Sequence, residues 1–300
     1  MKKTLLNFVF SFALLFASIS LNAQDFQGKA YYQTKTTMDL DQWGGREMSP
    51  EQKKRIEERM KSFLEKQYIL TFNKSESIYK EDEKLEAPGS GRGFGGFGSS
   101  FTGGPKYKNV KTKEVLQDQE FFGKQFLIKD ELNGLEWKMG TETKQIGQYT
   151  CFKATATKTV DQFDWRSMRR RGRDQDDKEK KESEVAKDST KTNDDPMSEI
   201  EVPKTIEVVA WYTPQIPINQ GPDDYWGLPG LILEVNADRT TILCTKIVMN
   251  PEEKEDIEKP NKGDEVTQAE YTEIITKKMQ EMREMYGGRN RGGRGGGRRN

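Results

Sequence analysis

The chain has no histidine and only two cysteines among its 300 residues. Histidine is the usual general base, the partner of serine and cysteine nucleophiles and the commonest zinc ligand, so its absence removes most familiar active sites. A Walker-type loop, a GxGxxG sequence after a strand and an EF-hand loop are also missing. Carboxylate catalysis stays open, but the 49 acidic residues single out no pair. We therefore expect a protein that is not an enzyme, with no catalytic residues, no metal site and no cofactor.

Neither sign of charge is in excess. Lysine and arginine together number 49, as do aspartate and glutamate, so the formal net charge is zero. No global attraction to nucleic acid or to an anionic membrane follows. Hydrophobic and charged residues each make up 33% of the chain, and the mean hydropathy is −0.92. Much of the chain therefore lies outside any core, which favours one domain over two.

Long apolar runs are confined to the first 23 residues. Lys2 and Lys3 precede an apolar stretch from Leu5 to Ile19, and Leu21-Asn22-Ala23 fits a cleavage site. This pattern predicts a signal peptide over residues 1–23. No later run is long enough to cross a bilayer, so we expect no membrane span after signal removal. The expected location is the periplasm, or the exterior or cell surface, of a Gram-negative bacterium.

Period-2 alternation predicts strands through most of the chain. Ala30 to Leu40 alternates between two faces and is rich in aromatic and β-branched residues. Further strands are predicted over Tyr68–Tyr79, Tyr107–Leu116, Glu120–Lys129, Tyr149–Val160, Ile206–Thr213, Leu231–Asn236 and Thr240–Met249. Asn133-Gly134 is a hairpin signal, and Asn236-Ala237-Asp238 is another candidate turn. Because these strands follow one another without helices between them, we expect an antiparallel sheet.

Two segments break this pattern with helical spacing. Ser49 to Gln67 and Thr267 to Tyr286 each begin with a capping box, formed by Ser49 with Gln52 and by Thr267 with Glu270. Their apolar stripes comprise Ile56, Met60, Phe63 and Leu64 in the first segment, and Tyr271, Ile275, Met279, Met282 and Met285 or Tyr286 in the second. Methionine clusters can bind soft cations, but the helical spacing favours packing against a core or a partner.

Three segments are predicted to be disordered. Residues 88–105 hold eight glycines, and residues 166–200 hold twenty charged residues, ten of each sign. Residues 287–300 consist of seven glycines, five arginines and two asparagines. None can bury enough apolar area to offset the entropy of ordering. We therefore predict a single β-rich domain over residues 24–286, with two inserts and a Gly/Arg-rich tail that either binds extracytoplasmic anions or only confers solubility.

Cys151 and Cys244 both lie in strand-like segments. In an oxidising compartment such a pair can form a disulfide, which would contribute about 3–5 kcal/mol. The alternative is a pair of buried, inert thiols. Whether the two strands adjoin cannot be deduced from the sequence, so both interpretations stay open.

The run WGLPGLILEV, Trp226 to Val235, joins turn residues directly to an apolar strand. Pro229-Gly230 predicts a type II turn, in which the glycine takes a positive φ. The phrases AWYTPQIP (210–217) and GPDDY (221–225) precede it. Together they resemble the GLPGLI family, exported bacterial proteins named after a hexapeptide that is intact here as Gly227, Leu228, Pro229, Gly230, Leu231 and Ile232.

The resemblance covers about residues 137–249, from Trp137 through KQIGQYTCFKATA (144–156) to TILCTKI (241–247). The long charged insert between KATA and VVAWYT departs from the family pattern. The family has no established activity, so the resemblance implies no catalytic or cofactor-binding residues.

Two roles for the hexapeptide region stay open. In the structural one, favoured here, the turn fixes strand register and closes one end of the sheet. In the functional one, Trp211, Tyr212, Tyr225 and Trp226 line a mouth that grips an apolar ligand or a peptide.

The sequence thus predicts a mainly β protein, an antiparallel, strongly curved sheet or partial barrel with an inserted helix and a C-terminal helix. The expected function is non-enzymatic binding of an apolar ligand or an envelope partner, with no nucleic acid involved. The alternative is an envelope assembly or scaffold component that acts through its charged and Gly/Arg-rich segments.

Overall fold

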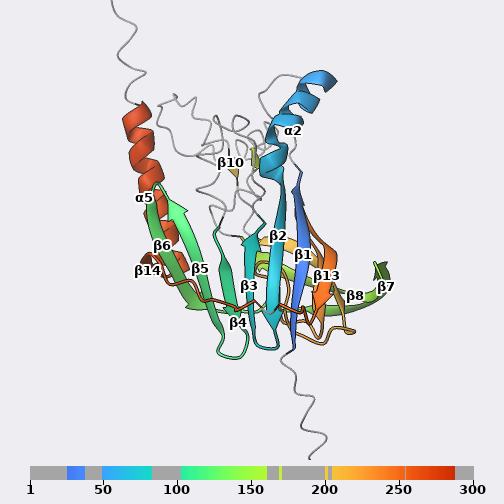
Figure 1. Ribbon diagram of the computed structural model, residues 1–300. Helices are drawn as coiled ribbons and strands as arrows, with labels where there is room; N and C mark the ends of the chain where they lie inside the picture. The colour runs from blue at the N-terminus through green and yellow to red at the C-terminus, as the bar shows by residue number, and fades with distance from the viewer. Residues whose placement is uncertain are drawn as a thin grey trace, which may run out of the picture.

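The computed structural model describes residues 26–37, 49–82, 103–160, 169–170, 200–201, 205–253 and 255–287. The predicted signal peptide, nearly all of the two predicted inserts and all but the first residue of the predicted tail lie outside these ranges. Within them, twelve strands form one open sheet and two more form a small two-stranded pair, accompanied by two helices (Figure 1).

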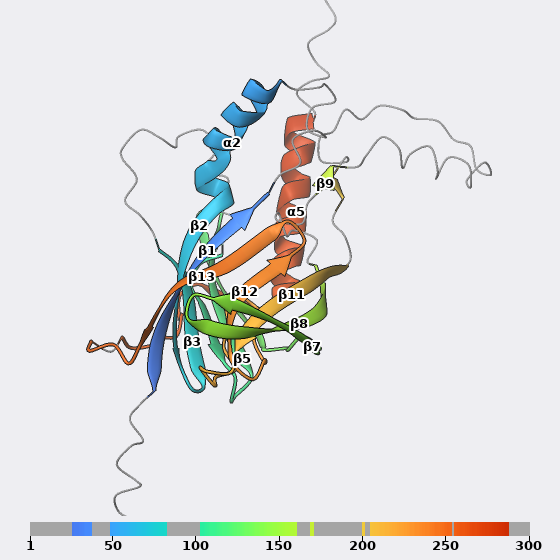
Figure 2. The same cartoon turned by 90° about the vertical axis from the view of Figure 1, so that its right-hand side faces the viewer.

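The large sheet runs in the order β14-β6-β5-β4-β3-β2-β1-β13-β12-β11-β8-β7. Its first half along the chain comprises β1 (Gln27–Thr36), β2 (Glu65–Asn73), β3 (Glu76–Glu81), β4 (Lys106–Asn109), β5 (Glu114–Phe121) and β6 (Lys124–Glu131). The second half comprises β7 (Lys138–Ile146), β8 (Tyr149–Thr159), β11 (Thr205–Thr213), β12 (Leu231–Ala237), β13 (Thr240–Met249) and β14 (Asp264–Val266) (Figure 2). All neighbouring pairs are antiparallel except β14 with β6, which is parallel. The mainly antiparallel β fold is therefore as predicted.

Three predicted strands each contain a hairpin turn in the structure. Residues 68–79 divide between β2 and β3, residues 107–116 between β4 and β5, and residues 120–129 between β5 and β6. The turns were missed because they depend on side-chain hydrogen bonds or on a positive φ, and not on a change in the hydrophobic pattern. Asn73 Oδ1 accepts hydrogen bonds from the backbone N–H groups of Ser75 and Glu76, and Phe122 takes a positive φ of 51°.

The hairpin predicted at Asn133-Gly134 is wrong. β6 and β7 are not neighbours, and residues 132–137, termed here the linker, lead from one end of the sheet order toward the opposite edge. The turn predicted near Asp238 is confirmed, because it joins β12 to β13, and Asp238 has a φ of 51°.

The main core lies on one face of the sheet, called here the inner face. Tyr32, Leu70, Phe72 and Ile232 are among its most deeply buried members, each at most 1% exposed. These residues sit on β1, β2 and β12, close to the middle of the sheet, where alternation sends every second side chain inward.

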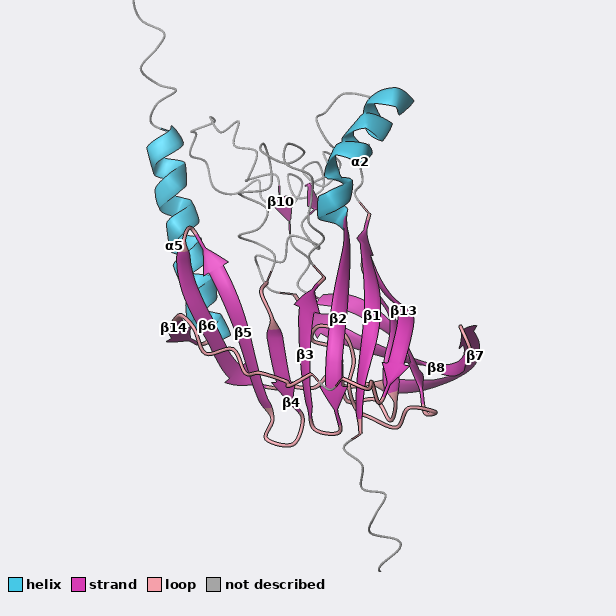
Figure 3. Ribbon diagram, viewed as in Figure 1, coloured by secondary structure: helices cyan, strands magenta, loops and turns pink. Residues whose placement is uncertain are grey.

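Both helices are confirmed, and both lie toward the same end of the sheet (Figure 3). Helix α5 (Gln268–Gly287) packs Tyr271 and Ile275 against Phe121, Phe126 and Ile128 of β5 and β6. Helix α2 (Pro50–Leu64) leads straight into β2, and none of its described side chains is buried. Neither helix in the described part of the chain is long and apolar enough to cross a membrane.

The small pair consists of β9 (Arg169–Arg170) and β10 (Ile200–Glu201), which lie near the two ends of the predicted charged insert. At the end of the predicted glycine-rich insert, Gly104 donates its backbone N–H to Asp118, and Pro105 accepts from Asp118. These last residues of the predicted insert therefore pair with β5.

Candidate functional site

The loop between β11 and β12, residues 214–230, lies across the inner face of the sheet and is termed here the crossing loop. Ile216, Ile218 and Leu228 are buried in the main core, so the loop is anchored by apolar contacts along its length. The fully buried Gln220 adds a polar anchor, because its side-chain oxygen accepts a hydrogen bond from Ser77 of β3 at 2.8 Å. The predicted hexapeptide occupies the end of this loop and the start of β12.

Two glycines of the loop are required by close packing. A Cβ on Gly230 would lie 2.2 Å from the carbonyl oxygen of Thr213, and one on Gly221 would lie 2.5 Å from that of Tyr225. The predicted type II turn is wrong, because Gly230 does not have a positive φ. The positive φ, 92°, is at Gly227 instead. The glycine at 230 serves close backbone approach.

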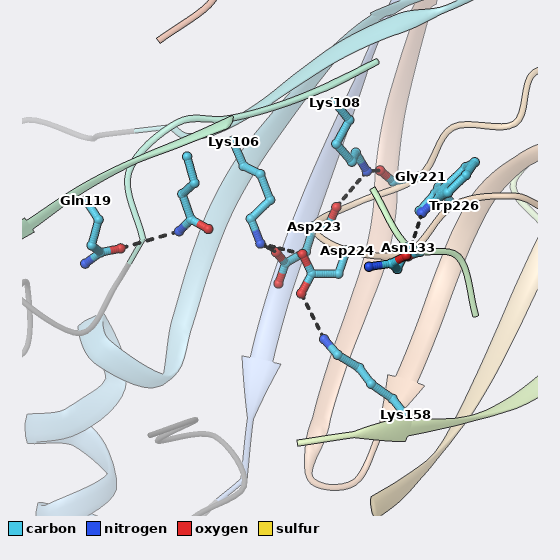
Figure 4. Close-up of polar contacts among 10 residues, drawn as sticks. Lys106, Lys108, Gln119, Asn133, Lys158, Gly221, Asp223, Asp224 and Trp226 are labelled. Atoms are coloured by element: carbon cyan, nitrogen blue, oxygen red, sulfur yellow. Dashed lines mark hydrogen bonds and ion pairs between the residues drawn. The ribbon is translucent and has the colours of Figure 1, made fainter. Parts of the chain in front are cut away.

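Five charged residues meet where the crossing loop passes β4, and together they form the ion cluster (Figure 4). Lys106 of β4 contacts the carboxylates of Asp223 and Asp224 at 2.7 and 2.6 Å. Lys158 of β8 contacts Asp224 from the opposite side at 2.9 Å. Lys108, the fifth member, also lies on β4 and contacts the backbone of the crossing loop. Since β4 and β8 are far apart in the sheet order, the loop connects the two halves of the sheet through its carboxylates.

The ion pairs dominate the protonation of the cluster. Burial alone lowers the pKa of Lys106, but the charges of Asp223 and Asp224 outweigh it and raise the pKa above its ordinary value. Burial raises the pKa of Asp224, yet Lys106 and Lys158 hold it well below its ordinary value. Lys106 and Asp224 are therefore both charged at neutral pH. The side chain of Asp224 is 45% exposed to solvent, whereas that of Lys106 is only 12% exposed.

Lys108 is fully buried and behaves differently. Its Nζ donates to the carbonyl oxygens of Gly221 and Asp223 at 2.7 and 2.6 Å. Burial lowers its pKa to about 7, against an opposing effect of Asp224 and Asp223. A neutral amine has two N–H donors, which match these two carbonyl acceptors.

The crossing loop is also tied to the linker by two tryptophans. The indole N–H of Trp137 donates to the carbonyl oxygen of Trp226 at 2.8 Å. The indole N–H of Trp226 donates in turn to the carbonyl oxygen of Asn133 at 3.3 Å. The Trp226 ring lies beside Gly134, where a Cβ would come within 3.4 Å of it. The linker and the loop therefore hold each other in place.

A cavity of about 450 Å³ adjoins the ion cluster. Lys106, Lys158, Asp223, Asp224 and Tyr225 contribute to its wall. The apolar part of the lining comprises Val115, Ile128, Leu132, Leu135, Val160, Ile206, Ala237, Ile242 and Ile275, and the remaining polar part includes Gln117, Gln119, Asp130, Glu131 and Thr240. The cavity thus has a large aliphatic surface and charged groups on its wall.

The four aromatic residues predicted to form a mouth do not converge. Only Tyr225 lines the cavity. Tyr212 is buried in the main core, and Trp211 lies on the opposite face of β11, where Lys144 stands 5.4 Å from its ring centre. Trp226 faces the linker.

Sequence reasoning missed the lysines of the site. Lys106 and Lys108 are two apart in the short strand β4, so they share a face, and the adjacent acids Asp223 and Asp224 lie within the GPDDY phrase. This pattern was visible, but nothing local indicates that β4, β8 and the loop meet.

Cys151 and Cys244 are both buried and free in this structure. Burial raises the pKa of the Cys151 thiol to about 11 and that of Cys244 to about 12. The described residues contain no group of three or more acidic or cysteine side chains that could hold a metal ion.

Residues 137–234 match the family model described as "Protein of unknown function (Porph_ging)". The matched segment begins at Trp137 and includes the whole crossing loop. No curated protein matches the chain. Two solved structures described as "Structure of PNGF-II", in the C2 and P21 space groups, are similar at 13% and 15% identity, each with a TM-score of 0.45. The similarity covers 84% of this chain and 33% of theirs, so the chain spans about a third of their length.

Proposed function

We propose that this chain is an exported, non-enzymatic binding protein of the GLPGLI family, which holds a small ligand with an apolar body in the cavity beside the crossing loop. Its location is the periplasm or cell surface. The signal-peptide pattern of residues 1–23 supports export, and the intact hexapeptide supports the family.

The cavity is the observation that carries this proposal. Its volume of about 450 Å³ falls within the range of about 300–1,000 Å³ typical of small-molecule sites. A sheet that served only as a scaffold would fill this space with side chains. The aliphatic lining favours an apolar body, and the charged groups beside it provide a means of fixing its orientation.

The lining also supports a strongly curved sheet, close to a partial barrel. Residues from β2, β3, β5 and β6 share one cavity with residues from β8, β11, β12 and β13. Strands at such separate places in the sheet order contribute to one cavity only if the sheet bends around it. Helix α5 adds Tyr271, Thr272 and Ile275 to the wall.

An envelope assembly component is the second candidate, and helix α2 favours it. Ile56, Met60 and Leu64 form a stripe whose members are only half-buried. A partner protein could cover this stripe. In that case the stripe would be the binding surface, and the cavity would have no role in binding.

The test is native mass spectrometry of the mature protein purified from its own envelope, followed by extraction and identification of released molecules. We expect a bound small molecule with an apolar body. Val115→Trp should abolish it by filling the cavity, because Val115 is part of the lining. The matched control is Leu243→Trp, since Leu243 is 37% exposed on the outer face of β13.

An unliganded protein of the calculated mass, in the parent and in both variants, would contradict ligand binding. The partner would then be sought by crosslinking in intact cells, with and without substitution of the α2 stripe.

A further inference from the structure

The ion cluster has more cationic groups than anionic ones. Lys106, Lys108 and Lys158 face two carboxylates, those of Asp223 and Asp224. When Lys108 is protonated, the cluster carries one net positive charge. The excess matters because the cluster forms part of a cavity wall, where charges are less screened than on an open surface.

The lysines of the cavity wall also have donors to spare. The contacts among described residues use two of the three N–H groups of Lys106 and one of the three of Lys158. The side chain of Lys158 is 26% exposed, and its Nζ stands 5.2 Å from the ring centre of Tyr225, another wall residue. An anion in the cavity could therefore receive hydrogen bonds from this group.

Asp224 is the exposed member of the cluster. Its side chain is 45% exposed, whereas those of Asp223 and Lys106 are 17% and 12% exposed. It bridges Lys106 and Lys158 with one oxygen on each. A carboxylate of a ligand has the same geometry and charge as this bridge, and a phosphate offers two acceptor oxygens with at least the same negative charge. Asp223 would still hold Lys106 in place.

We propose that the ligand of the cavity carries an anionic head group, which binds Lys106 and Lys158 in exchange for the carboxylate of Asp224, while its apolar body lies against the aliphatic lining. This rests on the proposed function, because it needs the cavity to be a binding site. The remaining carboxylates of the lining, Asp130 and Glu131, belong to the end of β6. Asp130 is occupied in accepting a hydrogen bond from the backbone N–H of Gln268 at the start of α5.

The experiment compares four probes that share one apolar body: octanoate, octyl phosphate, octan-1-ol and octylammonium. Their affinities for the mature protein are measured by calorimetry at pH 6, where Lys108 is also charged. We expect the two anions to bind about tenfold more tightly than the alcohol, which corresponds to one good charge-assisted contact. Octylammonium should bind least. Whichever anion binds more tightly identifies the head group as carboxylate or phosphate.

Two variants make the proposal specific. Asp224→Asn removes the internal competitor while keeping its shape, so both anions should bind more tightly than to the parent protein. Lys158→Gln should abolish the preference for anions and leave the affinity for octan-1-ol unchanged. Lys153→Gln serves as the matched control, because Lys153 of β8 pairs with Glu142 and is not part of the cavity.

The possible failures are distinguishable. If all four probes bind equally and Asp224→Asn weakens or leaves unchanged the binding of anions, the head-group assignment is wrong and the cavity function stands. If none of the probes binds to the folded parent protein, both proposals are overturned. Folding of each variant is checked by circular dichroism, and Asp224→Asn alone decides the question if Lys158→Gln does not fold.

Discussion

The buried Lys108 should make the stability of this protein depend on pH near and above neutrality. The ordinary pKa of lysine is 10.5, and burial brings that of Lys108 to about 7. Between these values the unfolded chain binds a proton that the folded chain does not. Stability therefore rises with pH through this window, by at most about 1.4 kcal/mol per pH unit.

We expect the midpoint of urea unfolding to increase from pH 7 to pH 9. Above pH 9 the two buried thiols act in the opposite direction, because their folded pKa values exceed the ordinary 9.0. Lys108→Met should remove the increase, whereas Lys153→Met, on an ion pair outside the cluster, should retain it. A flat profile in the parent protein would show that Lys108 stays charged when folded.

Gly230 is the second residue with a sharp requirement. Gly230→Ala places a Cβ against the backbone of Thr213 and Pro214, which cannot move as a flexible side chain would. We expect a loss of about 2 kcal/mol in the free energy of unfolding, measured by chemical denaturation.

Gly134→Ala is the control for this substitution, because its Cβ would make an ordinary contact with Trp226 at 3.4 Å. A loss of similar size at both positions would mean that general loop perturbation, rather than the close approach at Gly230, sets the cost.

At the scale of elements, the stability of helix α2 should be independent of the stability of the sheet. Its capping box is complete, with Ser49 Oγ accepting from Gln52 N and Gln52 Oε1 accepting from Ser49 N. Ser49→Ala should weaken the helix by about 1 kcal/mol. Since no described side chain of α2 is buried, the free energy of global unfolding should not change in this variant.

Hydrogen exchange resolved by peptide distinguishes the two effects. Amides of α2 should exchange faster in Ser49→Ala, and those of β1 and β2 should not. Faster exchange in both strands would mean that the helix supports the sheet.

The elements were predictable where a local pattern has a local cause. Both helices begin at the predicted capping boxes. β8, β11 and β13 follow alternating runs and β12 follows a continuous apolar run, each within a residue of its predicted bounds. β7 was missed because its side chains are exposed at nearly every position, so no alternation marks it. The ion cluster was missed for a different reason: Lys106, Lys158 and Asp224 are brought together only by the long-range arrangement of the sheet.

At the scale of the whole molecule, the two cysteines report on packing. Both thiols are free and buried, and their raised pKa values leave little thiolate at pH 8. We expect iodoacetamide to modify neither in the folded protein and both in 6 M urea, as counted by intact mass. An unmodified chain two mass units lighter would instead reveal the disulfide that the sequence left open.

The place of β1 in the sheet has a consequence for how the chain acquires its structure. β1 is the first strand, yet it lies between β2 and β13 near the middle of the sheet, with Tyr32 opposite both Tyr68 and Cys244. Its second neighbour becomes available only after some two hundred further residues have emerged, including the crossing loop. Contacts of such long sequence separation slow folding, because a large loop must close, at a cost in entropy, before the stabilising contacts form. The N-terminal half would therefore present an unpaired strand edge until the C-terminal half arrives, so the chain completes its sheet late.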